Sequence, residues 1–282
     1  MKRVLTLSTL LLSFAALAQT LPRTESVPGG VAVVPIESSA PHTPRAYLGD
    51  ARVMVVQQNE KWFAVVGLPL SFRNGEHELH VVDDAGRKQA QRFTVRSKEY
   101  GVQRITLQNK RMVNPTGDDL KRIDRDSSEI QRAFTKWREL GAPPLSFDLP
   151  VEGPISGVFG TRRFFNDQER QPHNGVDLAA PLGTPIRAPA DAVVIGAGDY
   201  FFNGRTVFLD HGQGLISMYN HMDRIAVTLG ETVKRGQRIG DVGMTGRVTG
   251  PHLHWGVSLN NVRVDPLLFV PEELLKNLTP TK

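Results

Sequence analysis

Short runs of strand-favouring residues, many of them apolar, recur along the first half of the chain between polar stretches. The runs lie at residues 52–56, 62–66, 78–82, 91–95 and 102–107. Several short runs of this kind, separated by turn-forming residues, indicate a small β-sandwich. We therefore expect residues 45–110 to form a β module.

Apolar residues then recur at helical spacing over residues 116–140. They are Leu120, Ile123, Ile130, Phe134 and Trp137. Thr116 or Asp118 is suited to cap the start of this helix, and Gly141 is suited to end it. We expect residues 111–144 to form a helical linker whose apolar face packs on a neighbouring domain.

From residue 145 onward the pattern returns to short β-rich runs interrupted by Gly and Pro. Strands are expected at residues 192–197, 206–209, 215–219 and 252–257. The pattern predicts an antiparallel β domain over residues 145–275, followed by a tail at residues 276–282.

The first 44 residues divide into two parts. Residues 1–18 combine Lys2 and Arg3 with an apolar run and an Ala-Leu-Ala end, which is typical of a secretory signal cleaved before Gln19. The run is short for an anchor that spans a bilayer, which needs about 20 apolar residues. Residues 19–44 are rich in Pro, Gly, Ser and Thr, and we expect a flexible linker or arm with one short strand at residues 31–34.

Composition narrows the chemistry. The chain of 282 residues is long enough for about two domains, and it has no cysteine, so disulfides, thiolate ligands and Cys nucleophiles are excluded. The formal charge of +5 is spread along the chain. This spread does not form the basic stripe expected of a nucleic-acid-binding protein.

Candidate chemistry is concentrated in the histidines of the second half. His173 and Asp177 lie four residues apart, and His252 and His254 follow far downstream. Catalytic zinc takes three protein ligands of the His and Asp/Glu type, so one His and one Asp from the first piece with one His from the second would complete a site. His252 and His254 would point to the same side of a strand, and His221 lies between the two pieces. The spacing alone leaves ordinary surface or core histidines as the alternative.

The motifs around these histidines favour a metal site over ordinary surface or core histidines. They read FGTRR at 159–163, HNGVDLAAPLGTP at 173–185, DHGQG at 210–214, VGMTG at 242–246 and TGPHLHWG at 249–256. In this order the motifs resemble the lysostaphin/LytM-type zinc metallopeptidases, peptidase family M23. The resemblance covers about residues 145–270. It implies an antiparallel β domain with a substrate groove, and the preceding β module resembles the Ig-like modules of some members of the family.

The resemblance also assigns roles. It implies that His173, Asp177 and His254 bind Zn²⁺, and that His221 and His252 are the catalytic pair. An imidazole with a pKa near ~6.5 can act as base or acid at working pH, but the sequence leaves open which of the two is the base. His211, in the DHGQG motif, is expected to be structural.

The implied activity is that of an exported endopeptidase that cuts peptide crosslinks or bridges of bacterial peptidoglycan. Glycyl-glycine bridges and D-amino-acid crosslinks both remain open as the scissile bond. We expect location in the periplasm or cell envelope and a regulatory cell-envelope protein as a partner. One alternative is a catalytically silent LytM-like activator of cell-wall amidases, and another is a wall-binding protein with a structural zinc. The complete ligand set and both catalytic histidines argue against these alternatives.

Overall fold

The computed structural model describes residues 20–38, 42–83, 86–276 and 278. The expected signal at residues 1–18 lies outside the described residues, as does most of the tail expected at residues 276–282. Strands dominate the described chain, so the mainly β fold class is confirmed. None of the helices among the described residues combines the length and the apolar character needed to cross a bilayer.

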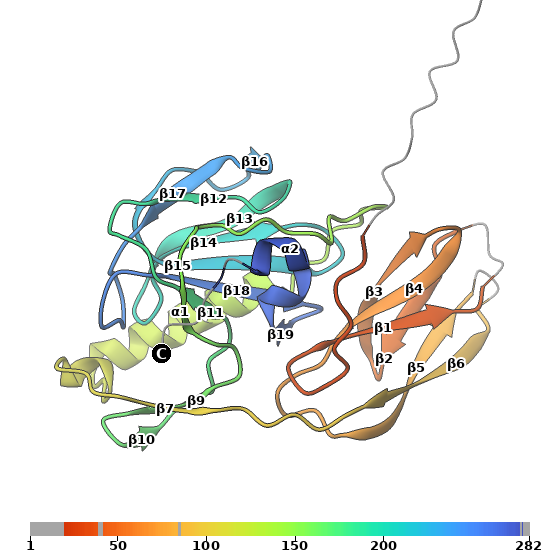
Figure 1. Cartoon of the computed structure of the whole chain (residues 1–282), viewed down its shortest axis with the longest axis horizontal. Coiled ribbons are helices and arrows are strands. Elements are labelled where there is room, and N and C mark those ends of the chain that lie inside the picture. The colour runs from red at the N-terminus through yellow and green to blue at the C-terminus, as the bar shows by residue number, and fades with distance from the viewer. Residues whose placement is uncertain (1–19, 39–41, 84–85, 277, 279–282) are drawn as a thin grey trace, which may run out of the picture.

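The N-terminal module consists of antiparallel strands around its own hydrophobic core (Figure 1). The strands are β1 Val31–Ile36, β2 Arg45–Leu48, β3 Ala51–Gln58, β4 Lys61–Gly67, β5 Gly75–Val82 and β6 Lys88–Val95. They are ordered β1-β4-β3-β2-β5-β6, and β1 also contacts β6, so the strands curl around the core. Each of the four predicted runs between residues 52 and 95 is confirmed as a strand.

The expectation of a flexible arm over residues 19–44 is wrong for much of that segment. The short strand expected within it is part of β1, which pairs along its full length with β4. Pro35 fits because β1 is an edge strand, where a missing backbone N–H costs no ladder hydrogen bond. The Pro and Gly content was typical of a linker, but the apolar side chains of β1 are buried.

The side chains on the two faces of β3 belong to two different hydrophobic cores. Val53 and Val55 of β3 point into the core of the module, whereas Met54 and Val56 join the core of the C-terminal domain. This follows from the two-residue period of a strand. The module is therefore packed against the following domain through an apolar face, and the amide of Val55 also donates to the side-chain Oε1 of Gln213 at 3.0 Å.

The C-terminal domain is built on an antiparallel sheet of ten strands. Its strands are β8 Ile155–Gly157, β11 Val176–Leu178, β12 Pro185–Arg187, β13 Ala192–Tyr200, β14 Gly204–Asp210, β15 Leu215–Ile225, β16 Thr232–Val233, β17 Arg238–Val242, β18 Leu253–Leu259 and β19 Val262–Val264. The central path runs β16-β13-β14-β15-β18-β11-β8. Short helices η2 Pro266–Phe269 and α2 Glu272–Leu275 follow. The β domain predicted for this part of the chain is confirmed.

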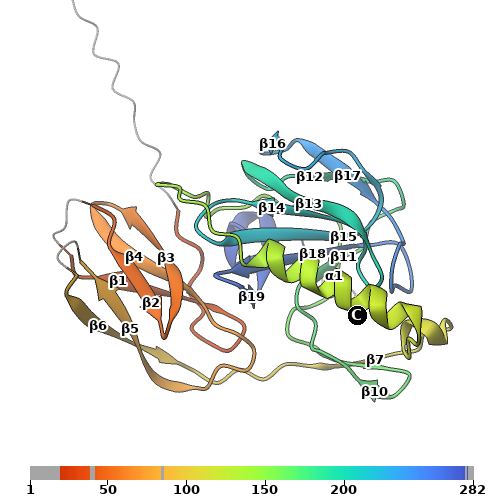
Figure 2. The same cartoon turned by 180° about the vertical axis from the view of Figure 1, so that it is seen from behind.

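Helix α1, Asp118–Phe134, lies along the C-terminal sheet (Figure 2). Ile130, Ala133 and Phe134 pack on residues of β13, β14 and β15, so the predicted packing is confirmed for the C-terminal part of the apolar face. Leu120, in the first turn, is exposed. Its predicted bounds and caps are wrong. Gly117 precedes the helix without a side-chain cap, and the helix ends at Phe134 rather than near residue 140.

The helix ends early because tertiary contacts hold the following residues in another conformation. The Arg138 guanidinium donates to the Asp210 carboxylate at 2.9 Å, and the Arg138 carbonyl accepts from the Gln213 amide. Trp137 lies under the guanidinium of Arg52 at 4.3 Å. These contacts outweigh the local helical pattern.

The strand expected at residues 102–107 exists but belongs to another sheet. It is β7, Val102–Ile105, which pairs in parallel with β9, Arg162–Phe165, and β9 pairs with β10, Gln168–Glu169. Figures 1 and 2 show the chain leaving β6 and running in an extended conformation to this small sheet beside the C-terminal domain. The 3₁₀ helix η1, Lys110–Met112, follows β7. The module thus ends with β6, and β7 lies next to the site described below.

Candidate metal and catalytic site

Neighbouring strands bring three candidate ligands together. Asp177 of β11 pairs in register with His254 of β18, and directly opposed residues of an antiparallel pair project on the same face. His173 lies in the loop that leads into β11. Gly175, between His173 and Asp177, leaves room for the approach, because a Cβ there would lie 2.4 Å from the Trp255 carbonyl oxygen.

The three side chains converge on one point. His173 Nε2 lies 3.0 Å from Asp177 Oδ1 and 2.9 Å from His254 Nδ1, and His254 Nδ1 lies 2.9 Å from the same Asp177 oxygen. All three residues are buried, and they form a group of donor atoms suited to a metal ion. Two imidazoles and one carboxylate are a donor set that zinc binds in proteins, so the residues present fit such an ion.

The electrostatics of Asp177 and His254 favour the protonation states that bind metal. Burial lowers the pKa of His254 to about 4, against the opposing effect of Asp177, so its imidazole is neutral near pH 7. Burial works against the charge of Asp177, but the imidazoles of His173 and His254 hold the pKa of this carboxyl well below its usual range. A neutral imidazole and an ionised carboxylate each offer a lone pair to a cation.

Outer contacts orient the ligands. The Val158 carbonyl oxygen lies 2.9 Å from His173 Nδ1, and since a carbonyl only accepts, this nitrogen carries the proton and Nε2 is free to bind. The second oxygen of Asp177 accepts from Arg163 Nη2 at 2.6 Å. Arg163 Nε in turn donates to Gln103 Oε1 of β7 at 3.1 Å. A chain of contacts thus connects β7 to the candidate metal centre.

Two further histidines flank the three ligands. The ring centroids of His221 and His252 are 5.0 Å apart, and the His221 ring lies 6.0 Å from that of His254. His252 Nε2 is 3.8 Å from Asp177 Oδ1. His252 precedes β18 in an isolated bridge with Gly243, rather than beginning the strand. The structure therefore brings all five sequence-predicted site residues into one cluster.

Backbone carbonyls fix both flanking imidazoles in one tautomer. His221 Nδ1 lies 2.8 Å from the Thr245 carbonyl oxygen, and His252 Nδ1 lies 2.9 Å from that of Gly250. Each Nδ1 is therefore the donor, which leaves Nε2 of the neutral ring able to accept a proton. His221 adopts a left-handed backbone conformation with φ of 64°, which is uncommon for a non-glycine residue and typical of functional positions. Burial, followed by the neighbouring His252 and His254, holds the pKa of His221 well below its usual range.

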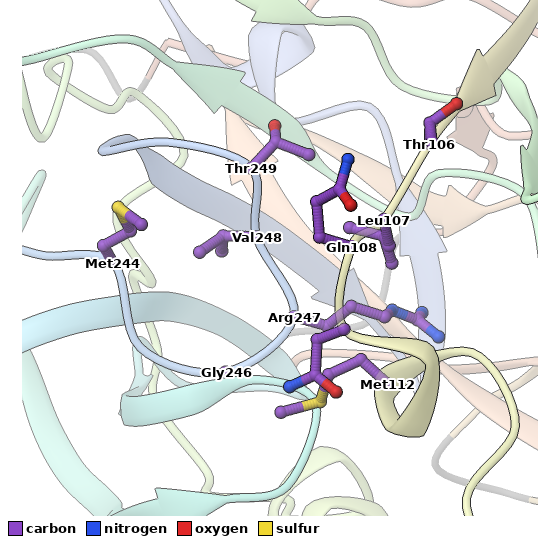
Figure 3. A pocket seen from close by; sticks show the side chains of 10 residues that line it. Thr106, Leu107, Gln108, Met112, Met244, Gly246, Arg247, Val248 and Thr249 are labelled. Carbon is purple, nitrogen blue, oxygen red and sulfur yellow. The ribbon is translucent and has the colours of Figure 1, made fainter.

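A cavity of about 130 Å³ opens on this cluster. Asp177, His221 and His252 line it on one side, and β7 contributes Gln103 and Ile105 on another. A neighbouring cavity of about 370 Å³ lies between η1 and the loop that connects β17 to β18 (Figure 3). A peptide lying along these cavities would pass over Asp177, His221 and His252.

Other polar residues have structural surroundings. His211 is fully buried, with its ring nitrogens 3.1 Å from the Asp191 carbonyl oxygen and 2.7 Å from Ser217 Oγ, as expected for a structural role. His77 lies in the N-terminal module, where it contacts the Arg73 carbonyl oxygen and the rings of Phe72 and Phe93.

Sequence reasoning missed Arg163, Gln103 and Arg247, which surround the site. Arg163 was visible as part of the FGTRR motif. Gln103 carried no local signal, because it reaches the site only through the pairing of β7 with β9. Arg247 lies in an irregular loop, where no period or motif marked it.

Two family models match the chain. The model described as peptidase family M23 matches residues 171–266, which include all five residues of the cluster. The model described as the peptidase family M23 N-terminal domain matches residues 24–98. The two matches coincide with the C-terminal domain and the N-terminal module.

Relatives agree with these matches. A crystal structure described as a peptidase M23 from Pseudomonas aeruginosa is 45% identical, with a TM-score of 0.74, and the similarity covers 87% of this chain and 95% of that one. Peptidoglycan DD-endopeptidase ShyC of Vibrio cholerae is 47% identical over 51% of this chain and 31% of the relative. DD-carboxypeptidase/endopeptidase Mpg of Neisseria meningitidis is 40% identical over 40% of this chain and 26% of the relative. The chain thus spans less than a third of the length of these two curated relatives.

Proposed function

The chain belongs to peptidase family M23, and on this basis we propose that it is a zinc-dependent endopeptidase that hydrolyses peptide crosslinks or bridges of bacterial peptidoglycan. One observation carries the proposal. Three metal-binding donor atoms converge within about hydrogen-bonding distance of one another, and two further imidazoles with free Nε2 atoms line the cavity above them.

The zinc ligands in this proposal are His173 Nε2, Asp177 Oδ1 and His254 Nδ1. Their protein charge is the single negative charge of Asp177, so the ion would stay net positive. When bound, zinc supplies Lewis acidity at the carbonyl group to be cleaved. Arg163 would keep the second Asp177 oxygen occupied, so that the carboxylate presents one oxygen to the ion.

His221 and His252 would move the protons. The attacking water must lose a proton, and the amine that leaves must gain one. Each imidazole has its Nδ1 held by a backbone carbonyl, so Nε2 is the atom that exchanges protons with the substrate side. Burial keeps the His221 imidazole in the neutral form, in which Nε2 carries the lone pair that a base needs. Protonated Nε2 of either residue could also donate a hydrogen bond to the developing oxyanion.

The activities for which these relatives are named point to the substrate and to the place of action. We propose that the substrate is a crosslinked stem peptide of peptidoglycan, which places the enzyme in the cell envelope. Export through the signal at residues 1–18, and control by a second cell-envelope protein, belong to the same proposal. A non-catalytic activator of amidases would not need these five side chains in this arrangement, so we favour the hypothesis of an enzyme.

The test is incubation of zinc-loaded protein with purified crosslinked muropeptides, followed by mass spectrometry of the products. We expect dimeric muropeptides to be converted to monomers, a chelator to stop the reaction and added zinc to restore it. Intact dimers after prolonged incubation with zinc-loaded protein would contradict the proposal. Stimulation of a cell-wall amidase by that same inactive protein would favour the activator alternative.

A further inference from the structure

Arg247 carries a positive charge that the described part of the chain does not neutralise. It lies in the loop between β17 and β18, where its guanidinium carbon is 4.5 Å from the ring centroid of Phe165 and 4.4 Å from that of Phe202. Among the described residues, no carboxylate forms an ion pair with this guanidinium and no oxygen accepts a hydrogen bond from it. Ring faces attract a cation, but they leave the in-plane N–H donors without acceptors.

The position of Arg247 relates this charge to the catalytic cluster. Arg247 lines the cavity of about 130 Å³ together with Asp177, His221 and His252. It also lines the neighbouring cavity of about 370 Å³. Figure 3 shows its side chain extending from the loop across to the segment that carries Leu107 and Met112. A group bound to Arg247 would therefore lie within a few residues of the scissile bond.

The charges nearby favour an anionic ligand. Asp177 is the single acidic residue in the lining of the two cavities, and its oxygens are already engaged by His173, His254 and Arg163. Burial, together with the positive charges of Arg163 and Arg170, lowers the pKa of Arg247 to about 10, which still leaves it protonated near pH 7. Pairing with an anion stabilises a partly buried cation that lies beside other cations.

We propose that Arg247 binds a free carboxylate of the peptide substrate next to the scissile bond. A planar carboxylate can take two N–H donors of a guanidinium at once, which an uncharged peptide group cannot do. The inference rests on the proposed peptidase function and narrows its substrate class. Crosslinks whose peptides carry a free carboxylate near the cleaved bond fit the site, whereas an uncharged glycyl-glycine bridge would leave Arg247 unpaired.

The experiment compares two substrates and two proteins. Crosslinked muropeptides are used as isolated and after amidation of their carboxylates, and kcat/KM is measured for wild type and Arg247→Gln. A hydrogen-bonded charge pair corresponds to a loss of about 10- to 100-fold when either partner is removed. We therefore expect that loss on amidation for wild type, and on the native substrate for Arg247→Gln. Amidation of the substrate should then lower kcat/KM of Arg247→Gln by less than about 3-fold, because this variant has already lost the pair between guanidinium and carboxylate.

Equal losses on amidation in both proteins, or a wild-type kcat/KM for Arg247→Gln on the native substrate, would overturn the inference. Arg125→Gln is the matched control, since it removes the same charge from an exposed position on α1, and it should behave as wild type. Arg247→Lys keeps the positive charge but lacks the paired N–H donors of a guanidinium. Its kcat/KM on the native substrate should therefore lie between those of wild type and Arg247→Gln. Peptides amidated singly, at the C-terminal or at a side-chain carboxylate, identify which group Arg247 contacts.

Two further arms keep the result interpretable. If Arg247→Gln does not fold, as judged by its melting temperature, the wild-type comparison decides: equal kcat/KM for native and amidated muropeptides overturns the inference. If wild type cleaves neither substrate, the proposed peptidase activity has failed. Arg247 is then judged by calorimetric titration of wild type with the two muropeptides, where equal dissociation constants overturn the inference and tighter binding of the native form supports it.

Discussion

Gly157 is a position where one methyl group should weaken metal binding. It lies on β8, in register with Asp177 of β11. A Cβ at this position would lie 2.3 Å from Asp177 Oδ2, 2.9 Å from Asp177 Cγ and 2.8 Å from Arg163 Nη2. Because carbon atoms pack against other heavy atoms at about 3.5 Å or more, the Gly157→Ala variant must displace the carboxylate or the strand by about 1 Å.

The size of the effect follows from what moves. Asp177 supplies one of three proposed ligands, and its orientation depends on the Arg163 contact that the methyl group would disturb. Disturbing the groups that orient a metal ligand costs about 10- to 100-fold in affinity, which is about 1.4 to 2.7 kcal/mol. We expect the zinc dissociation constant of Gly157→Ala to rise by that factor.

The assay is competition for zinc between the protein and a chromophoric chelator at fixed pH. Gly101→Ala is the matched control, because a Cβ there meets no atom within 4 Å. It should keep the wild-type dissociation constant. A wild-type zinc dissociation constant for Gly157→Ala as well would show that the Asp177 carboxylate is not held as tightly as these distances require.

Three further predictions concern the ligands, their orientation and a buried histidine. Wild type should carry about one zinc per chain by elemental analysis, and alanine at His173, Asp177 or His254 should remove most of it. Arg163→Gln should weaken zinc binding by about 10- to 100-fold in the same chelator competition, because Asp177 loses its orienting donor. Burial lowers the pKa of His211 to about 4, so its neutral form stabilises the fold fully above pH ~6.5. As the pH falls from there towards 4, the unfolded state takes up a proton that the folded state does not, and up to ~3 kcal/mol of stability is lost. Urea unfolding across this range should show a shallower decline for His211→Asn.

Each of these predictions has a contrary result. Undiminished zinc in all three alanine variants would refute the ligand assignment. Unchanged affinity in Arg163→Gln would mean that the Asp177 carboxylate is oriented by the strand alone. Parallel stability curves for wild type and His211→Asn would show that His211 takes up its proton equally in the folded and unfolded states.

The strands of this fold were predictable because their pattern is local. The run at residues 52–56 alternates in side-chain direction, yet nearly all its members are apolar. The structure explains this: Val53 and Val55 face one core, and Met54 and Val56 face the other. A continuous apolar run is typical of a strand buried on both faces, and the docking of the module gives that pattern its physical reason.

The connections were harder to predict because partners distant in sequence decide them. Residues 19–44 have a composition typical of a linker, but β1 is held by β4, whose residues lie about thirty positions later. The residues after Phe134 continue a helical pattern, yet Arg138 is drawn to Asp210. In both places tertiary contacts override local preference.

The residues of the site also fall into two groups, those with a local sequence signal and those without one. His173, Asp177, His252 and His254 each lie within a motif and His221 follows one closely, because the local backbone must place them on particular strands and loops. Residues that approach from elsewhere leave no such signal. Gln103 reaches the cluster through parallel pairing of β7 with β9, and Arg247 through an irregular loop.

In the proposed mechanism, His221 and His252 move protons while His173, Asp177 and His254 hold zinc. The most direct test is the turnover of crosslinked muropeptide per bound zinc, measured for wild type, His221→Ala and His252→Ala at matched zinc content. Positioned acid–base groups contribute about 100- to 10,000-fold to such reactions, so each variant should lose activity within that range while its zinc and melting temperature are unchanged. Because both residues serve one transition state, the double variant should lose little more than either single one. Turnover at the wild-type rate in both single variants would show that neither imidazole is needed for proton transfer.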